Sequence, residues 1–255
     1  MILAHDVVDE IPKNDSAGTV PILLLHSTVC DRRMWDQQMN TIAVAGYRAI
    51  RCDLSGYGET PASSSPYSDA DDVLALMDDL GVEQASLIGA SGGGLVATEV
   101  AARWPERVPN LLLVSTAAAD HEPSPELAAF AAEEEELLEA GKIERAVELN
   151  LNTWVRSDVP NRTRELVGQM QRRAFELQLA MDDVEELEAA VDPSRIAART
   201  LLVSGARDFE DFRRIAEDLT ARIPSAEHRH LDWAGHLPTL EHPEEMDQLI
   251  MDFLA

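Results

Sequence analysis

The sequence predicts an α/β fold in which a mostly parallel sheet of about seven strands is flanked by helices. Short apolar runs alternate with segments whose apolar residues recur at helical spacing, a pattern typical of a parallel sheet with crossover helices. The 255 residues are enough to bury one substantial core, and a hydrophobic content of 45% argues against disorder. We therefore expect a single core domain with an insertion.

The strands are predicted from short apolar runs bounded by turn residues. An apolar run of this length between Gly, Pro or Asp residues is typical of a strand that is buried on both faces of a parallel sheet. The predicted strands lie at 2–8, 20–25, 48–52, 85–88, 111–114, 201–203 and 228–231.

Amphipathic segments between these runs predict the crossover helices. Their apolar residues are spaced three or four apart, so that each helix buries one face on the sheet. Ser68 stands where an N-cap is expected before the second of them. The four apolar stripes are Trp35/Met39/Ile42, Val73/Met77/Leu80, Phe212/Ile215/Leu219 and Met246/Leu249/Ile250/Phe253.

The alternation of strands and helices stops after the fifth run, and three helical patterns follow one another. Ser124 and Pro125 are placed as cap and first residue of one helix, and Gly141 ends it. A second stripe covers 143–154, and a third, capped by Asn161, ends near Met181. We predict a helical cap inserted at 120–197 into a core formed by 1–119 and 198–255.

Charge and composition narrow the classes of partner. The net charge of −26 arises from 47 acidic against 21 basic residues, and such a field repels nucleic acid and anionic lipid. No apolar stretch reaches the roughly 18 residues of a membrane span. We therefore expect a cytoplasmic protein, a monomer or homodimer, whose partner is a small-molecule ester or lactone and neither nucleic acid nor a membrane.

The sequence contains no pattern that indicates a metal or another cofactor. Cys30 and Cys52 have neither zinc-site spacing nor the density of a disulfide framework, so we expect both to be buried apolar residues. His228 and His230 alternate on a predicted strand without a nearby third ligand. We predict that the protein uses no cofactor and no metal.

The stretch Gly89-Ala90-Ser91-Gly92-Gly93 follows a predicted strand and opens a predicted helix. Glycines there remove side chains where strand and helix crowd together, and the turn residue is left exposed at the carboxyl edge of the sheet. A phosphate-binding loop would require a lysine after the glycines or a GxGxxG pattern, and the following Leu95-Val96 provides neither. We interpret Ser91 as a nucleophile.

A serine nucleophile needs a base to accept its proton and a carboxylate to orient that base. His236 lies in a loop after the last predicted strand, and Asp208 lies in a loop after the preceding one. Asp120 and Asp211 are alternative positions for the acid. The order Ser91, Asp208, His236 resembles the chain order of serine hydrolases of the α/β type.

These features resemble the α/β-hydrolase superfamily over nearly the whole chain. The segment LLLHSTVCDRRMW at 23–35 is similar to the family's His-Gly oxyanion segment, and CDLSGYGET at 52–60 is similar to its Asp-x-x-Gly-x-Gly-x-Ser/Thr turn. The resemblance implies that the backbone amides of Thr28 and Gly92 stabilise an oxyanion. Ser27 replaces the usual glycine and is a candidate further donor, while Gly92 replaces a bulkier residue and predicts a roomier acyl pocket.

The predicted activity is hydrolysis of a small to medium, neutral carboxylic ester through an acyl-enzyme on Ser91. Trp154, Phe130 and Met170 of the cap are predicted to bind substrate, although packing between cap helices explains them equally well. Relatives that open epoxides use an aspartate in place of the serine, which disfavours that activity.

Several alternatives remain at this stage. Segments 26–39 and 113–119 are similar to 3-oxoadipate enol-lactonases, whose substrate carboxylate would need an arginine, such as Arg172 or Arg173. Carbon–carbon bond hydrolases and cofactor-free perhydrolases would use the same three residues. A ligand receptor on a hydrolase fold is the non-enzymatic alternative. The acidic run 133–136 suggests an aminopeptidase only weakly, since a solvated helix face explains it.

Overall fold

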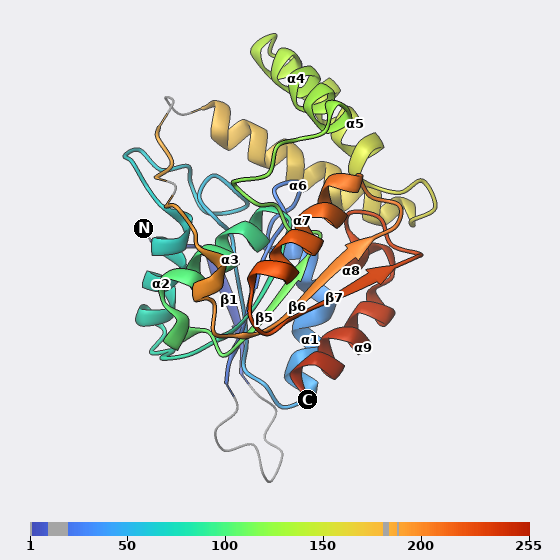
Figure 1. Cartoon of the computed structure of the whole chain (residues 1–255). Helices are drawn as coiled ribbons and strands as arrows, with labels where there is room; N and C mark the ends of the chain where they lie inside the picture. Colours follow the sequence, from blue (N-terminus) through green and yellow to red (C-terminus); the bar gives the residue numbers. More distant parts are fainter. Residues whose placement is uncertain (1, 10–19, 181–183, 188) are drawn as a thin grey trace.

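The computed structural model describes residues 2–9, 20–180, 184–187 and 189–255 and contains one seven-stranded sheet (Figure 1). Its strand order is β1-β3-β2-β4-β5-β6-β7, with β1 antiparallel to β3 and all other neighbours parallel. The predicted fold class is therefore confirmed. The strands are β1 His5–Val8, β2 Ile22–Leu25, β3 Ala49–Cys52, β4 Ser86–Ala90, β5 Asn110–Val114, β6 Arg199–Gly205 and β7 Ala226–Leu231.

Helices cover both faces of the sheet. Helix α1 (Asp36–Val44) packs with α9 (Pro243–Leu254) on one face, and α2 (Asp69–Asp79), α3 (Gly92–Arg103) and α7 (Glu210–Arg222) lie on the other (Figure 1). Burial from both sides explains why β2 and β4 have no exposed residue. Short helices at Arg32–Trp35, Pro105–Arg107, Pro193–Arg195 and Pro238–Glu241 (α8) connect these elements.

Three helices are inserted between β5 and β6, and they lie above the carboxyl edge of the sheet (Figure 1). They are α4 (Pro125–Glu139), α5 (Ile143–Trp154) and α6 (Asn161–Leu179). Helix α4 projects farthest from the sheet and buries none of its residues, whereas α5 and α6 pack together around Ala146, Val147 and Phe175. The insertion therefore rests on the sheet mainly through α5 and α6.

Local sequence signals set the ends of several helices. The hydroxyls of Ser68 and Ser124 accept hydrogen bonds from the amides of Asp71 and Leu127, at 3.3 and 3.2 Å, so both predicted N-caps are confirmed. Gly141 follows α4 with a φ of 66°, a conformation that favours glycine. The prediction for Asn161 is wrong: it is the first residue of α6, and Pro160, whose fixed φ suits the entry to a helix, holds the N-cap position.

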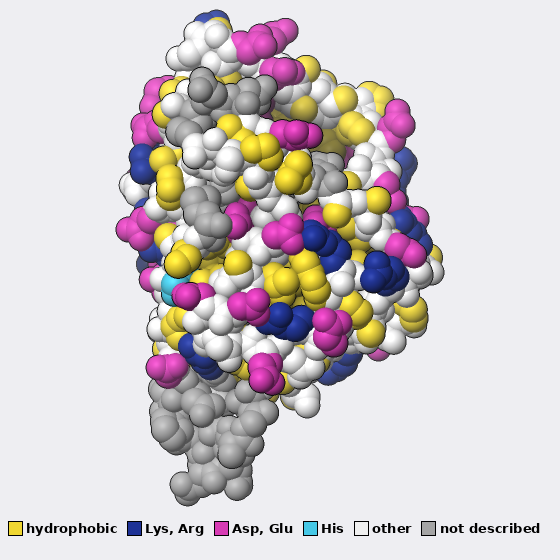
Figure 2. Space-filling model, turned by 90° about the vertical axis from the view of Figure 1, so that its left-hand side faces the viewer, with side chains coloured by type: hydrophobic (Ala, Val, Ile, Leu, Met, Phe, Trp, Pro, Cys, Tyr) yellow, Lys and Arg dark blue, Asp and Glu magenta, His cyan; other side chains and the backbone are white. Residues whose placement is uncertain are grey.

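On the face shown in Figure 2, acidic side chains are spread rather than gathered in one patch, and basic side chains lie among them. Cys30 and Cys52 are buried and free, as predicted. Within the described ranges, no helix combines the length and the apolar character that crossing a lipid bilayer requires. Met181, the predicted end of the third apolar stripe, lies outside the described residues.

Candidate active site

Ser91 occupies a strained turn between β4 and α3. Its φ of 51° and ψ of −117° lie in a backbone region that residues other than glycine rarely adopt. A Cβ atom at Gly89 would collide with the backbone of Gly93, and a Cβ at Gly93 would collide with the carbonyl of His26. The glycines therefore let strand and helix backbones approach closely, and the turn between them presents the Ser91 side chain at the carboxyl edge of the sheet.

The structure brings Ser91, Asp208 and His236 into one hydrogen-bonded chain. The distance from His236 Nε2 to Ser91 Oγ is 3.1 Å, and that from His236 Nδ1 to Asp208 Oδ2 is 2.8 Å. With an ionised Asp208 as acceptor, Nδ1 donates and Nε2 accepts the proton of the serine hydroxyl. Asp208 Oδ1 also accepts from the amide of Phe209 at 2.8 Å, which fixes the carboxylate. The arrangement can remove the Ser91 proton and return it to a leaving group.

Neither alternative acid contacts His236. Asp211 accepts hydrogen bonds from His121 Nε2 at 2.8 Å and from the Ser124 amide at 2.7 Å. Burial alone would raise the pKa of Asp211, but these hydrogen bonds outweigh it and hold the pKa at about 2. Asp120 pairs instead with Arg222 at 2.7 Å. Asp211 therefore ties the segment before α4 to the start of α7.

Aromatic rings enclose the His236 imidazole. The ring centres of Trp154 and Phe212 each lie 4.4 Å from that of His236. Phe130, predicted to bind substrate, lies behind Trp154 with the ring centres 4.9 Å apart. Met170 is fully buried, and its sulfur accepts a hydrogen bond from the Asp31 amide at 3.4 Å. Of the three predicted cap residues, only Trp154 contacts the histidine, because Phe130 and Met170 are used in packing.

The amides predicted to hold an oxyanion lie next to each other. Gly92 is the first residue of α3, so its amide has no partner within the helix. In the described part of the chain the Thr28 amide also has no hydrogen-bond partner. A Cβ at Gly92 would lie 2.5 Å from the Thr28 methyl group, which shows how close the two residues are. Ser27 Oγ is fully buried and, among the described residues, has no partner.

His26 holds the oxyanion segment in place. Its Nδ1 donates to the carbonyl of Ser27 at 2.9 Å, and its Nε2 accepts from the Leu54 amide at 3.0 Å. Burial lowers the pKa of His26, which favours the neutral ring that this pair of contacts requires. The histidine thus links the loop after β2 to the turn after β3.

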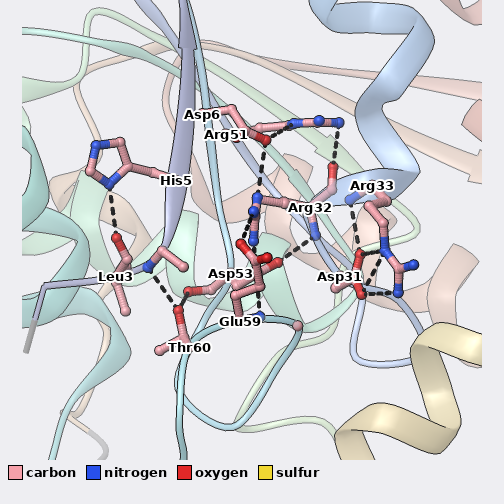
Figure 3. A network of polar contacts seen from close by, with 12 residues as sticks. Leu3, His5, Asp6, Asp31, Arg32, Arg33, Arg51, Asp53, Glu59 and Thr60 are labelled. Atoms are coloured by element: carbon pink, nitrogen blue, oxygen red, sulfur yellow. Dashed lines mark hydrogen bonds and ion pairs between the residues drawn. The ribbon is translucent and has the colours of Figure 1, made fainter.

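Figure 3 shows a polar network that also connects these two loops. Asp53 accepts from the amides of Arg32, at 2.8 Å, and Glu59, at 2.9 Å, and it pairs with the Arg32 guanidinium. Thr60 Oγ1 donates to the Asp53 carbonyl at 2.8 Å. A Cβ at Gly58, whose φ is 53°, would collide with the Asp53 carboxylate. The motif at 52–60 therefore fastens the loop after β2 to the turn after β3.

Two cavities flank the Ser91–His236 pair. The arginine-lined cavity has a volume of about 770 Å³ and includes Trp154, Asp208 and His236 in its wall. The acidic cavity has a volume of about 570 Å³ and includes Thr28 and Gly92. Four arginines line the first, namely Arg156, Arg164, Arg207 and Arg213, whereas Asp69, Glu186, Tyr57 and Tyr67 line the second.

The arginines differ in how far their charge is neutralised. Arg213 pairs with Glu210 and Glu217, while the Arg164 guanidinium contacts only neutral acceptors of α5. No acidic side chain of the described chain lies within ion-pair distance of Arg207. The arginines suggested for a substrate carboxylate lie elsewhere: Arg172 pairs with Glu144 at 2.5 Å, and Arg173 contacts the carbonyl of Gly58 at 3.3 Å.

The acidic cavity contains a buried carboxyl group that sequence reasoning missed. Asp69 is 8% exposed, and its Oδ1 accepts from the Ser55 amide at 3.3 Å. Burial, and next the charge of Glu186, raise its pKa to about 7. In sequence, Asp69 is an ordinary acid in the first turn of a helix, and only the folded chain places it in a cavity.

The structure gives no indication of a metal site in the residues it describes. No group of three or more His, Cys, Asp or Glu side chains among them is arranged to hold an ion. His228 Nε2 and His230 Nδ1 both hydrogen-bond Ser204 Oγ, at 2.8 and 3.0 Å. These two histidines are accounted for by that contact.

Comparisons with known proteins agree with the fold. A 2-hydroxy-6-oxononadienedioate/2-hydroxy-6-oxononatrienedioate hydrolase of Paraburkholderia phymatum is 28% identical over 95% of this chain and 90% of its own. Epoxide hydrolase 3 of Siraitia grosvenorii is 35% identical, but over only 39% of this chain and 34% of that protein. The enol-lactonase of Burkholderia xenovorans superposes with a TM-score of 0.76 at 24% identity, covering 99% and 96% of the two chains.

The match to a family model is broader than the local alignment to the epoxide hydrolase. The model of the alpha/beta hydrolase family covers residues 22–249, from β2 to α9. This range includes the Ser91 turn, the inserted helices and the loops of Asp208 and His236. The chain therefore belongs to the alpha/beta hydrolase family.

Proposed function

We propose that this hydrolase cleaves small to medium carboxylic esters through an acyl-enzyme on Ser91. The observation that carries the proposal is the hydrogen-bonded chain from Ser91 Oγ through His236 to Asp208. Such a chain activates an otherwise weak hydroxyl nucleophile. The serine also disfavours epoxide opening, for which an aspartate nucleophile is expected.

The first half of the reaction forms the acyl-enzyme. His236 Nε2 accepts the Ser91 proton as Oγ bonds to the ester carbonyl carbon, and Asp208 stabilises the resulting imidazolium. The carbonyl oxygen becomes an oxyanion that accepts hydrogen bonds from the amides of Thr28 and Gly92; one such donor contributes about 3 to 4 kcal/mol. The intermediate then expels the alcohol, which takes the proton from His236.

The second half repeats these steps with water. His236 removes a proton from a water molecule, which attacks the acyl carbonyl, and the same two amides hold the second oxyanion. Collapse releases the carboxylic acid and returns the proton to Ser91 Oγ. One ester and one water molecule thus give one alcohol and one carboxylic acid, and the residues of the site are regenerated.

A substrate with a carboxylate is the second candidate, and the arginine-lined cavity favours it. Arg164 contacts neutral acceptors, and in the described chain Arg207 forms no ion pair, although its charge, after the contacts of Arg156, helps to lower the pKa of Asp158. An anionic lactone, or a ketoacid cleaved at a carbon–carbon bond, would place its carboxylate there. The full-length similarity to a hydrolase whose name specifies a dioate supports the same alternative.

The test compares wild type with Ser91→Ala on p-nitrophenyl esters of increasing chain length and on a panel of neutral and carboxylate-bearing lactones. We expect wild type to hydrolyse short and medium esters and Ser91→Ala to lose about 10⁴-fold or more in kcat. A fluorophosphonate should also form an adduct that mass spectrometry maps to Ser91. Equal hydrolysis by both proteins, or by neither on any substrate, would overturn the proposal.

A further inference from the structure

A second buried carboxylate lies directly behind the predicted base. Glu241 is the last residue of α8, and its side chain is 2% exposed. Its Oε2 accepts from the Gly235 amide at 2.7 Å, and its Oε1 accepts from the Leu237 amide at 3.3 Å. These are the amides immediately before and after His236, so one carboxylate holds both ends of the peptide that carries the imidazole.

The backbone next to His236 is shaped for this contact. A Cβ atom at Gly235 would lie 2.6 Å from Glu241 Oε1 and 3.1 Å from side-chain carbons of Arg156. Only glycine leaves room for the carboxylate and the guanidinium chain to approach the peptide together. The close fit shows that Glu241 is an integral part of the His236 loop.

Arg156 connects Glu241 to the inserted helices. It follows α5, its side chain is 16% exposed, and its Nε lies 4.0 Å from Glu241 Oε2, while its Nη2 pairs with the exposed Asp158. The Nε is buried and, in the described part of the chain, makes no hydrogen bond. Burial raises the pKa of Glu241, and the two amides, Arg156 and His236 limit the rise. The guanidinium therefore helps to keep the carboxylate ionised.

The other side chains around His236 contact its ring. Ser91 and Asp208 hydrogen-bond the two ring nitrogens, and Trp154 and Phe212 pack against the ring. None of them restrains the peptide that carries the ring. Glu241 does so, and its charge lies close enough to favour the imidazolium that forms when Ser91 is deprotonated.

We propose that Glu241 is a positioning residue for His236, which orients the imidazole through the two flanking amides and stabilises its charged form, and that Arg156 couples this function to the inserted helices. The proposal rests on the role of His236 as the base in the proposed function. It predicts effects on kcat and on pH dependence that a merely structural carboxylate would not produce.

The first experiment compares Glu241→Gln with Glu244→Gln, a matched change at an exposed position of α9. Glutamine has one acceptor oxygen, so its NH₂ group must face one of the two amides. We expect Glu241→Gln to lower kcat about 10- to 100-fold on the best ester, with KM changed less than about twofold, because the bound substrate does not touch this side chain.

We also expect the acidic limb of the kcat/KM profile to move to lower pH, since loss of a nearby negative charge disfavours the imidazolium. Glu244→Gln should change neither quantity.

The second experiment adds Arg156→Met and the double variant. Arg156→Met should lower kcat by about 3- to 10-fold, and the double variant should be no slower than Glu241→Gln, because both changes act on one interaction. Equal kcat and pH profiles for Glu241→Gln and wild type would overturn the proposal. If Glu241→Gln does not fold, Arg156→Met decides: an unmoved pH profile overturns the proposal, and a displaced one supports it.

A direct measurement separates this inference from the proposed function. Nuclear magnetic resonance titration of the His236 imidazole in wild type, Glu241→Gln and Glu244→Gln needs no substrate. A midpoint lowered only in Glu241→Gln supports the positioning role even if no ester is hydrolysed. Identical midpoints in all three proteins would overturn it while leaving the activity of Ser91 intact.

Discussion

The two cavities that flank Ser91 and His236 differ in their charged side chains: arginines lie among Glu126, Asp208 and Glu210 in one wall, whereas the described wall of the other has acids but no arginine or lysine. On the side of Asp208 the wall includes four arginines, although the chain as a whole has 21 basic and 47 acidic residues. On the side of Thr28 and Gly92 the wall includes Asp69 and Glu186. A net charge of −26 therefore says little about the local field that a substrate meets.

Each cavity also has one buried carboxyl group, and the two differ in their partners. Asp208 has the His236 imidazole at 2.8 Å and the Phe209 amide at 2.8 Å. Asp69 has the Ser55 amide, and its pKa is raised to about 7. A buried carboxylate is tolerated when hydrogen bonds and opposite charge offset its desolvation, and it becomes protonated when they do not. The first group is suited to catalysis and the second to sensing pH.

Removal of the Asp208 charge should have the largest effect. We expect Asp208→Asn to lower kcat by about 10³- to 10⁴-fold, because an amide at Nδ1 favours the wrong tautomer of His236. Asp211→Asn is the matched control: three residues away, this side chain bonds His121 and Ser124. Its kcat should stay within about threefold of wild type, with a loss of stability of about 1 to 2 kcal/mol. A larger loss of kcat in Asp211→Asn than in Asp208→Asn would reverse the assignment of the acid.

The Asp69 carboxyl should produce the next largest effect, on stability. Its pKa is about 7 in the folded chain against an ordinary 3.8, so the folded state binds the extra proton between these values. This contribution to the free energy of unfolding is complete below about pH 4 and is lost as pH rises through 7, by at most about 4 kcal/mol. An asparagine side chain does not ionise, so the Asp69→Asn variant should lose less stability than wild type between pH 5 and pH 8.

Urea unfolding at pH 5, 6, 7 and 8 measures this difference. Asp79→Asn, at an exposed position of the same helix, is the control and should follow wild type. Parallel curves for Asp69→Asn and wild type would show that folding does not raise the pKa of Asp69. The contrast between the two buried carboxyl groups would then disappear.

The differences between the two cavities and between their buried carboxyl groups could not be predicted from the sequence, whereas the fold and the serine turn could. Strands and helices follow from local periodicity, and Ser91 is recognisable because its turn requires glycines on both sides. Asp208 and His236 follow from chain order, since each sits in the loop after a strand. The periodicity and the glycine-rich turn each involve residues that lie only a few positions apart in the sequence.

Cavity walls depend on residues that are far apart in the chain. Arg207, Arg164 and Glu241 each occupy positions where a charged side chain is unremarkable in sequence, and only the tertiary fold brings them to the site. The same limitation applies to Phe130 and Met170, whose role in substrate binding stays a prediction. A helical stripe shows that a side chain is buried, but not whether it faces a cavity or a neighbouring helix.

The smallest expected effect concerns the arginine-lined cavity and decides which substrate class it serves. Arg207 lines the cavity and forms no ion pair in the described chain, although Asp158 lies near enough to respond to its charge, so its guanidinium can pair with a ligand at the edge of the Asp208 loop. If a substrate carboxylate binds there, Arg207→Ala should lower kcat/KM for a carboxylate-bearing ester or lactone about 5- to 10-fold, equivalent to about 1 to 1.4 kcal/mol. The same change should leave a neutral ester of equal length unaffected.

Arg172→Ala is the control, because that arginine lies on the exposed side of α6 and pairs with Glu144. Raising the salt concentration should weaken the preference in wild type and not in Arg207→Ala, since screening acts on the charge that the variant lacks. An equal loss on charged and neutral substrates would instead mean that Arg207 supports the loop, and the substrate would be the neutral ester.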